Sequence, residues 1–276
     1  MQLSEKVGGW RSDIEDREWL VANSLAMQSL PVVDAADRPK EVDPRSWSKM
    51  RSQGQEGSCQ GHDIAACGEG CFHVASGDVI SFSPDVAYYQ TQKIDGLLGA
   101  DNGSTISGGM KMATTVGFCP EEAMPYSDRY NPQDQPANVT ELCAPYKVAK
   151  HCVFSGPDYF KQVVDWIGSG FGFVSYGIDW GVTLDSHGVA SWNPRGQGGH
   201  ANAAMGYTGP IGADGYPKYI IAKNSWGDWG PLHGWYLWER GQFNRVMAYP
   251  GSVIIGISDM SEIKPRKISW EENFPC

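Results

Sequence analysis

The sequence lacks a long apolar run, a basic cluster and any internal repeat, and each absence excludes a class of protein. No stretch of the 276 residues stays apolar over the length of a transmembrane helix, so we expect no membrane partner. The formal net charge is −10 and no Lys/Arg cluster occurs, which argues against nucleic acid as a partner because phosphate binding needs clustered basic side chains. We therefore expect a soluble globular protein of one large domain or two small ones.

Signals for secretion are also missing. The amino terminus has no basic region followed by an apolar core, so we expect no secretory signal peptide. The seven cysteines are an odd number, which favours reduced thiols over a disulfide framework. Both observations predict a cytoplasmic protein. The alternative is a mature secreted form, in which Cys143 and Cys152 would be the pair favoured by proximity in sequence.

A glycine-laced loop at residues 53–59 (QGQEGSC) precedes a predicted helix that begins at Cys59 and runs to about residue 74. Gly54 and Gly57 permit backbone conformations that are closed to other residues. A thiol at the start of a helix lies at the positive end of the helix dipole, which favours the thiolate. The loop therefore predicts that Cys59 is a nucleophile with a lowered pKa.

Helical patterns fill the first half of the chain and strand patterns fill most of the second. Further helices are expected from Ser83, over residues 106–116 and over residues 159–167. Short aromatic and β-branched runs predict strands at 171–178, 203–207, 219–222 and 235–238. The proline-rich residues 127–145 are the expected connection between the two halves. This order predicts an α+β protein with two lobes.

A cysteine nucleophile needs a base, a group that orients the base, and donors for the oxyanion. His200 begins one predicted strand and Asn224 follows another. If the two strands pair, Asn224 can bond one imidazole nitrogen and hold the other toward Cys59, with Trp226 shielding that bond from water.

Three motifs carry a resemblance to a known family: GQEGSC at 54–59, HANAAMGY at 200–207 and KNSWGDWG at 223–230. Together they resemble the papain family of cysteine peptidases in order and spacing. The segments SPDVAYYQTQKIDG and GFCPEEAMPY are similar to parts of its prokaryotic and viral members. The resemblance implies a two-lobed fold with a cleft between the lobes and the following division of the chain: an arm at 1–45, a peptidase domain at 46–256 with a helical lobe at about 46–140 and a β-rich lobe at about 145–256, and a tail at 257–276.

The resemblance also implies roles for four residues. Cys59 would be the nucleophile, His200 the general base and later acid, and Asn224 the residue that orients the imidazole. Gln53 stands six residues before Cys59, where the family places the glutamine whose amide lines the oxyanion hole. No metal or organic cofactor is implied.

Substrate-binding residues are expected in two places. Asn102, Gly103 and Ser104 lie near the position of the family's substrate-binding glycine pair. Ile106, Ala201 and the neighbours of Asp179 are the expected walls of a specificity pocket beside the cleft.

Two departures from the family pattern stand close to Cys59. Glu56 occupies the position where secreted relatives usually carry the cysteine of their first disulfide, and Gln60 begins a changed sequence after the nucleophile, where it is expected to tune access to the thiol. Only about forty residues precede the domain, so no full-length inhibitory propeptide is expected. Restraint would then come from the arm, from a partner, or not exist.

The sequence predicts a cysteine peptidase acting on protein or peptide substrates, and it leaves alternatives open. The fold could serve as a structural or binding component of a larger assembly such as a virus particle, with the arm or the tail contacting the partner. The same acyl enzyme could support a transpeptidase. A metal cluster of His62, Cys67, Cys71 and His73 is disfavoured, because Cys67 and Cys71 fit the core face of a helix.

Overall fold

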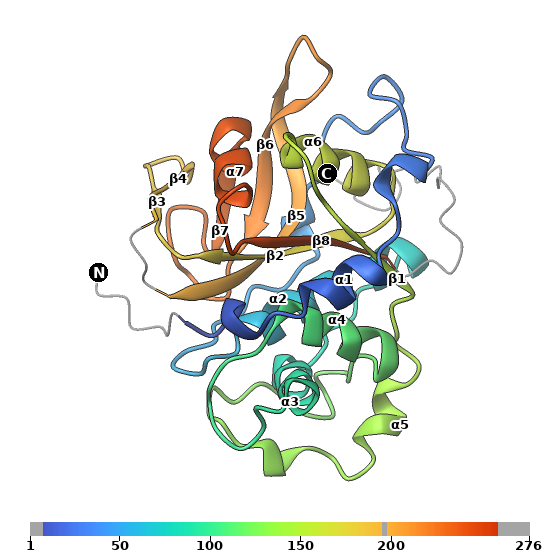
Figure 1. Cartoon of the computed structure of the whole chain (residues 1–276), viewed down its shortest axis with the longest axis vertical. Helices are drawn as coiled ribbons and strands as arrows, with labels where there is room; N and C mark the ends of the chain where they lie inside the picture. The colour runs from blue at the N-terminus through green and yellow to red at the C-terminus, as the bar shows by residue number, and fades with distance from the viewer. Residues whose placement is uncertain (1–7, 195–197, 259–276) are drawn as a thin grey trace.

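Helix α2 (Cys59–Ser76) lies between the two layers of the computed structural model, which describes residues 8–194 and 198–258 (Figure 1). It packs against α3 (Pro84–Asp95) and α4 (Ile106–Thr115) on one side and against β2 (Phe173–Asp179) and β5 (Gly199–Ile211) on the other. Glycines on this helix allow the close approach: a Cβ on Gly61 would lie 2.8 Å from Tyr88 Cβ, and one on Gly68 would lie 2.6 Å from the Phe118 ring. The helix ends at Gly77, which adopts the left-handed conformation typical of a C-cap.

The predicted helices are confirmed, and the side chains that cap them explain where they begin. Ser83 accepts a hydrogen bond from Val86 N at the start of α3, and Thr105 accepts one from Gly108 N at the start of α4. Figure 1 shows α2, α3, α4 and α5 on one side of the sheet and α6 and α7 on the other. The remaining helices are α1 (Arg17–Ala22), α3 (Pro84–Asp95), α4 (Ile106–Thr115), α5 (Val139–Cys143), α6 (Tyr159–Gly168) and α7 (Arg240–Met247).

Six strands of the described chain form one antiparallel sheet in the order β1-β8-β2-β5-β6-β7, and β3 and β4 form a separate hairpin. The register places Ile178 opposite His200 and Ala203 opposite Lys223, so the predicted pairing of the His200 and Asn224 strands is confirmed. Helices followed by an antiparallel sheet confirm the α+β class. The strands are β1 (Lys150–Val153), β2 (Phe173–Asp179), β3 (Val182–Leu184), β4 (Ala190–Trp192), β5 (Gly199–Ile211), β6 (Pro217–Lys223), β7 (Trp235–Glu239) and β8 (Val253–Ser258).

The arm, from residue 8 onward, packs along the chain's own lobes. Leu25 N donates to His151 O at 2.8 Å on β1, and Val42 and Tyr207 exchange two backbone hydrogen bonds of 3.0 Å on β5. The arm is therefore fixed to the domain by backbone bonds. The tail expected at 257–276 starts within β8, and residues 259–276 lie outside the described residues.

Cys143 and Cys152 do not form the disulfide considered for a secreted form. Both thiols are free and buried. Cys143 belongs to the cluster under α3 and contacts Cys119, whereas Cys152 packs in the main core. Among residues 8–194 and 198–258, no helix has the length and apolarity needed to cross a membrane, and no group of His, Cys, Asp or Glu is arranged to hold a metal ion.

The contact between α2 and β2 generates a stability prediction. A Cβ on Gly70 would lie 3.0 Å from Phe173 Cγ, with two other ring carbons still nearer. We expect Gly70→Ala to lower the free energy of unfolding by about 1–2 kcal/mol, because overpacking outweighs the gain in helix propensity. Gly241→Ala in α7 is the matched control, since a Cβ there meets nothing within 4 Å and the change should stabilise by about 0.5–1 kcal/mol. Equal urea midpoints for the two variants would contradict this packing.

Candidate active site

Cys59 is the first residue of α2, and the loop before it brings it to strand β5. Ala201 N donates to Cys59 Sγ at 3.5 Å. The loop turns at Gly54, whose φ of +55° favours glycine. Gln53 N donates to Ser225 O at 2.7 Å, so the start of the loop is tied to the segment that follows β6. The thiol consequently lies on the boundary between the two lobes.

His200 and Asn224 form a buried pair, and His200 directly precedes Ala201, whose backbone N–H contacts the thiol. His200 Nε2 lies 2.8 Å from Asn224 Oδ1, and Ser225 N donates to the same oxygen at 2.7 Å. An atom that accepts from a backbone N–H is the amide oxygen, so Nε2 carries the imidazole hydrogen and Nδ1 keeps its lone pair. Within the described part of the chain, Nδ1 has no hydrogen-bond partner. The neutral ring thus presents a base at Nδ1.

Two tryptophans enclose the imidazole. Trp226, expected as a shield, lies with its ring centroid 4.6 Å from that of His200. Trp180, which the sequence analysis did not single out, contacts the same ring edge-on at 4.8 Å. Both indoles are 2% exposed, so they keep water from the His200–Asn224 bond. The available signal for Trp180 was its place directly after a strand that pairs with the His200 strand.

The Gln53 amide is held in one orientation. Ser225 Oγ donates to Gln53 Oε1 at 2.5 Å, and Gln53 Nε2 donates to Glu56 O at 2.8 Å. The amide nitrogen therefore faces the loop that leads to Cys59. Ser225 was also missed from sequence, although it directly follows Asn224.

The arm covers the thiol. Gly9 packs so closely on the loop that a Cβ there would lie 2.9 Å from Cys59 Sγ and nearer still to Gly57 O. Gly8 N and Trp10 N both donate to Gly199 O, at 3.0 and 3.3 Å, which fixes the arm to the head of β5. Cys59 is accordingly 0% exposed.

The expected substrate-binding segment binds the arm from the other lobe. Ser104 N donates to Gly9 O at 2.9 Å, and Arg11 N donates to Ser104 O at 2.9 Å. Asn102 O accepts from Arg11 Nη1 at 3.3 Å, and a Cβ on Gly103 would collide with the Gly9 carbonyl. The arm thus crosses the site from the loop before α4 to the start of β5.

The expected wall residues Ile106 and Ala201 lie at opposite sides of the arm. Ile106 N, at the first turn of α4, donates to Glu15 Oε2 at 3.0 Å. Ala201 is opposite Gly177 in the β2–β5 ladder, and a Cβ on Gly177 would lie 2.6 Å from Trp10 Cδ2. Both residues therefore border the segment that carries Trp10.

Burial under the arm opposes ionisation of Cys59 and His200. It raises the pKa of the Cys59 thiol to about 12, although the hydrogen bond from Ala201 N acts in the opposite direction. It lowers the pKa of His200 to about 4, against the effect of the bond to Asn224. The lowered thiol pKa expected from the helix dipole is therefore not found in this arm-covered state, because desolvation outweighs the dipole.

Gln60, expected from sequence to tune access to the thiol, packs against α4. Its Oε1 accepts from Ser104 Oγ at 3.1 Å, and a Cβ on Gly109 would overlap its Nε2. Gln60 is fully buried in the first turn of α2. It therefore supports the segment that holds the arm.

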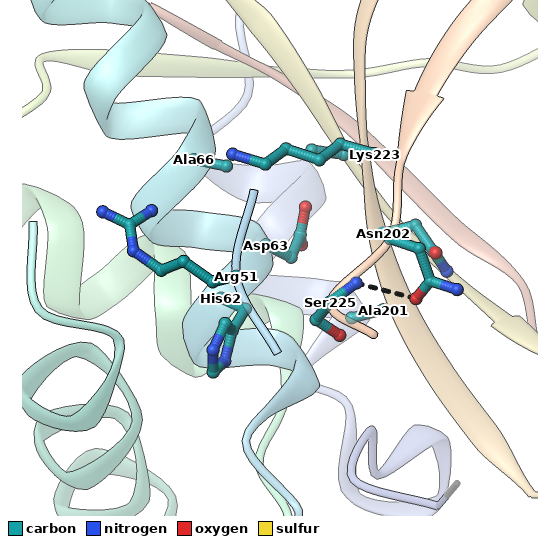
Figure 2. Close-up of a pocket in the computed structure, with 10 residues that line it drawn as sticks. Arg51, His62, Asp63, Ala66, Ala201, Asn202, Lys223 and Ser225 are labelled. Carbon is teal, nitrogen blue, oxygen red and sulfur yellow. Dashed lines mark hydrogen bonds between the residues drawn. The ribbon is translucent and has the colours of Figure 1, made fainter. Parts of the chain in front are cut away.

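A polar pocket adjoins Asn224 between α2 and the sheet (Figure 2). Lys223 extends from β6 toward α2, and its Nζ donates to Ser48 Oγ at 2.8 Å. Burial lowers the pKa of Lys223 to about 8. Burial likewise raises the pKa of Asp63, which accepts a hydrogen bond from Ser175 Oγ. These polar contacts join the two lobes behind the candidate active site.

Glu56 cross-links the loop through hydrogen bonds. Tyr89 Oη donates to Glu56 Oε1 at 2.9 Å, and Tyr126 Oη lies 3.1 Å from Oε2. The Asp85 carboxyl contacts Glu56, and Asp85 Oδ1 has no hydrogen donor among the residues that the structure describes. Two carboxyl groups share such a contact when one of them carries a proton. Burial, followed by the charge of Glu56, raises the pKa of Asp85 to about 8.

This proton generates a pH prediction. When the pKa of an acid is higher in the folded state than in the unfolded state, the free energy of unfolding falls as pH rises from one pKa to the other. For Asp85 this range runs from about 4 to about 8. Asp85→Asn keeps the shape and supplies a permanent donor to Glu56. The unfolding free energy of Asp85→Asn relative to the unmodified protein should therefore rise across this window and level off above it.

Urea unfolding at several pH values measures the difference. Asp134→Asn is the control, because it makes the same chemical change at an exposed carboxyl. Parallel curves for Asp85→Asn and the unmodified protein would show that no proton is held at this pair.

Comparisons with known proteins agree with this geometry. A model of the papain family of cysteine proteases matches residues 38–252. No curated protein gives a significant match.

Solved structures share the fold at low identity. Xylellain, a cysteine protease from Xylella fastidiosa, is 19% identical with a TM-score of 0.70, over 94% of this chain and 99% of its own. Digestive procathepsin L 3 of the Tenebrio molitor larval midgut is 19% identical with a TM-score of 0.62, over 88% and 78%. The Carica candamarcensis cysteine protease CMS1MS2, in complex with E-64, is 18% identical with a TM-score of 0.56, over 80% and 99%. Because the family model spans residues 38–252, the chain belongs to the papain family of cysteine proteases.

Proposed function

We propose that this chain is a cysteine peptidase that hydrolyses peptide bonds through Cys59, His200 and Asn224. The observation that carries the proposal is the 2.8 Å bond from His200 Nε2 to Asn224 Oδ1, which leaves Nδ1 as the basic nitrogen of the ring. The position of Cys59 at the first turn of α2, beside the head of β5, supports its role as the nucleophile.

Acylation begins when Cys59 Sγ transfers its proton to His200 Nδ1 and the thiolate attacks the carbonyl carbon of the substrate. The π electron pair of the C=O bond moves to oxygen, where the proposed donors are Gln53 Nε2 and the backbone N–H of Cys59. When the carbonyl re-forms, the C–N bond breaks and Nδ1 gives its proton to the leaving amine. A thioester then joins the acyl group to Sγ.

Deacylation uses water. His200 Nδ1 accepts a proton from the water as its oxygen attacks the thioester carbon, the C–S bond breaks, and the proton returns to the thiolate. Asn224 stabilises the imidazolium that forms in both halves of the reaction. Trp226 and Trp180 keep water from the His200–Asn224 hydrogen bond.

The arm restrains the reaction in the conformation described above. Gly9 covers Cys59 Sγ, and burial keeps both the thiol and His200 neutral at pH 7. Movement of residues 8–14 away from the loop would hydrate the pair and allow the proton to pass from Sγ to Nδ1. We therefore propose that the arm and the substrate compete for one cleft.

Two alternatives keep the fold and change the outcome. A transpeptidase would pass the acyl group to an amine instead of water, and product mass distinguishes the two because hydrolysis adds one water to the substrate. A structural or binding component of an assembly would need no reactive thiol. The ordered His200–Asn224 pair favours the peptidase, because a structural role does not need an oriented base.

The first test removes the nucleophile. Cys59→Ala should lower kcat/KM for a peptide library by about 1000-fold or more, because no other group can form the acyl enzyme. Cys67→Ala, which removes a buried thiol from the same helix, should retain activity. E-64, bound in the Carica candamarcensis structure, should add its mass to the peptide that contains Cys59. Hydrolysis that survives Cys59→Ala would refute the assignment.

The second test opens the arm. Trp10→Ala removes a buried indole that anchors the arm, so alkylation of Cys59 by iodoacetamide at neutral pH should accelerate by about tenfold or more. Trp19→Ala is the matched control, because Trp19 belongs to the same arm but stacks on His151 away from the thiol. Identical alkylation rates for Trp10→Ala and the unmodified chain would argue against restraint by the arm.

A further inference from the structure

We propose that Gly177 and Glu15 make the pocket filled by Trp10 selective for a substrate side chain that is aromatic and carries a hydrogen-bond donor, tryptophan first. The inference rests on the proposed function, since it assigns a substrate class to the same cleft. The side chain of Trp10 is 3% exposed, so the pocket is already shaped around an indole.

Missing side chains on the sheet create the room for the indole. A Cβ on Gly177 would lie 2.6 Å from Trp10 Cδ2, and a Cβ on Gly199 would lie 3.1 Å from Cε3. Ala201, opposite Gly177 in the ladder, shares its face and adds only a methyl group. Any larger residue at 177 would occupy the space of the ring, which makes Gly177 the residue that sets the size of the pocket.

The far end of the pocket holds an acceptor. Trp10 Nε1 donates to Glu15 Oε2 at 2.9 Å. The same carboxylate accepts from Ile106 N at 3.0 Å and from Ser107 N at 2.5 Å at the first turn of α4. The two backbone N–H donors hold the Glu15 carboxylate at the first turn of α4, so it can accept from an incoming indole as it does from Trp10.

Residues 8–11 and residues 15–16 of the arm are held by different kinds of contact. Gly8, Gly9, Trp10 and Arg11 are joined to the two walls by backbone hydrogen bonds at Gly199 and Ser104, which an extended substrate can also make. Glu15 and Asp16 are bound to α4, where Asp16 pairs with Lys111. Displacement of residues 8–14 would therefore empty the pocket while Glu15 remains at its end.

Gly9 relates the position of the pocket to that of the Cys59 thiol. It lies against Cys59 Sγ while the next residue, Trp10, fills the pocket. A substrate that follows the same path would place an aromatic residue beside the peptide bond that reaches the thiol. The arm thus marks where the selective side chain binds.

The binding experiment uses the full chain with Trp10→Ala and Cys59→Ala, which empties the pocket and removes hydrolysis. Binding of N-acetyl-tryptophanamide, N-acetyl-phenylalaninamide and N-acetyl-alaninamide is measured by NMR titration. We expect the tryptophan amide to bind about tenfold or more tightly than the alanine amide, from burial of the ring. It should bind about three- to tenfold more tightly than the phenylalanine amide, from the Glu15 hydrogen bond.

Two further variants assign the selectivity to residues. Gly177→Val in the same background should abolish the preference for both aromatic amides, whereas Glu15→Gln should reduce only the difference between tryptophan and phenylalanine. With Trp19→Ala in place of Trp10→Ala, the pocket stays filled and no amide should bind. Equal binding of the three amides, or aromatic binding that survives Gly177→Val, would overturn the proposal.

A parallel assay separates this inference from the proposed function. Trp10→Ala with Cys59 intact receives peptides that differ only by Trp or Ala at one position. Cleavage of both at equal rates refutes the pocket and leaves the peptidase standing. Selective amide binding without any cleavage refutes the peptidase and leaves the pocket standing.

Discussion

The contact between the first turn of α2 and the head of β5 is the constraint on which the candidate site depends. It brings Ala201 N to 3.5 Å from Cys59 Sγ and so joins the end of one lobe to the edge of the other. The sheet register fixes the partner, because a slip of one residue in β5 would turn His200 to the opposite face. Polar contacts behind the site, including Lys223 with Ser48, hold the same two surfaces together. The proposed pair of Cys59 and His200 therefore depends on the interface between the lobes rather than on either lobe alone.

Burial at that interface explains how the proposed catalytic residues can all be present while their ionisation is opposed. Gly9 shields the thiol from water, and desolvation then favours the neutral forms of Cys59 and His200 over the ion pair. The loop below the thiol is held by Glu56, whose hydrogen bonds to the tyrosines stand where secreted relatives are expected to carry a disulfide. A hydrogen-bonded cross-link responds to pH, whereas a disulfide responds to redox conditions. Among the described residues, the loop is thus held by hydrogen bonds of Glu56.

The sequence was sufficient for the elements and for the order of the candidate residues, because both depend on local patterns. Helix periodicity located α2, and small residues next to His200 indicated the strand that carries it. Contacts between segments distant in sequence could not be predicted from these local patterns. Nothing in the pattern around Gly9 or Trp10 indicated that the arm crosses the thiol, and Gly177 carries no side chain that could signal a pocket. The contact of Gln60 with α4 could not be predicted either, because it depends on how closely α4 approaches at Gly109.

The central claim is that Cys59 reacts at a cleft which the arm and the substrate occupy in turn. A crystal structure of the chain after reaction with an epoxide thiol inhibitor tests both halves of that claim at once. The account predicts electron density continuous with Cys59 Sγ and residues 8–14 displaced from between Ser104 and Gly199. Density on another cysteine, or an adduct on Cys59 with Gly9 and Trp10 still in the cleft, would contradict it.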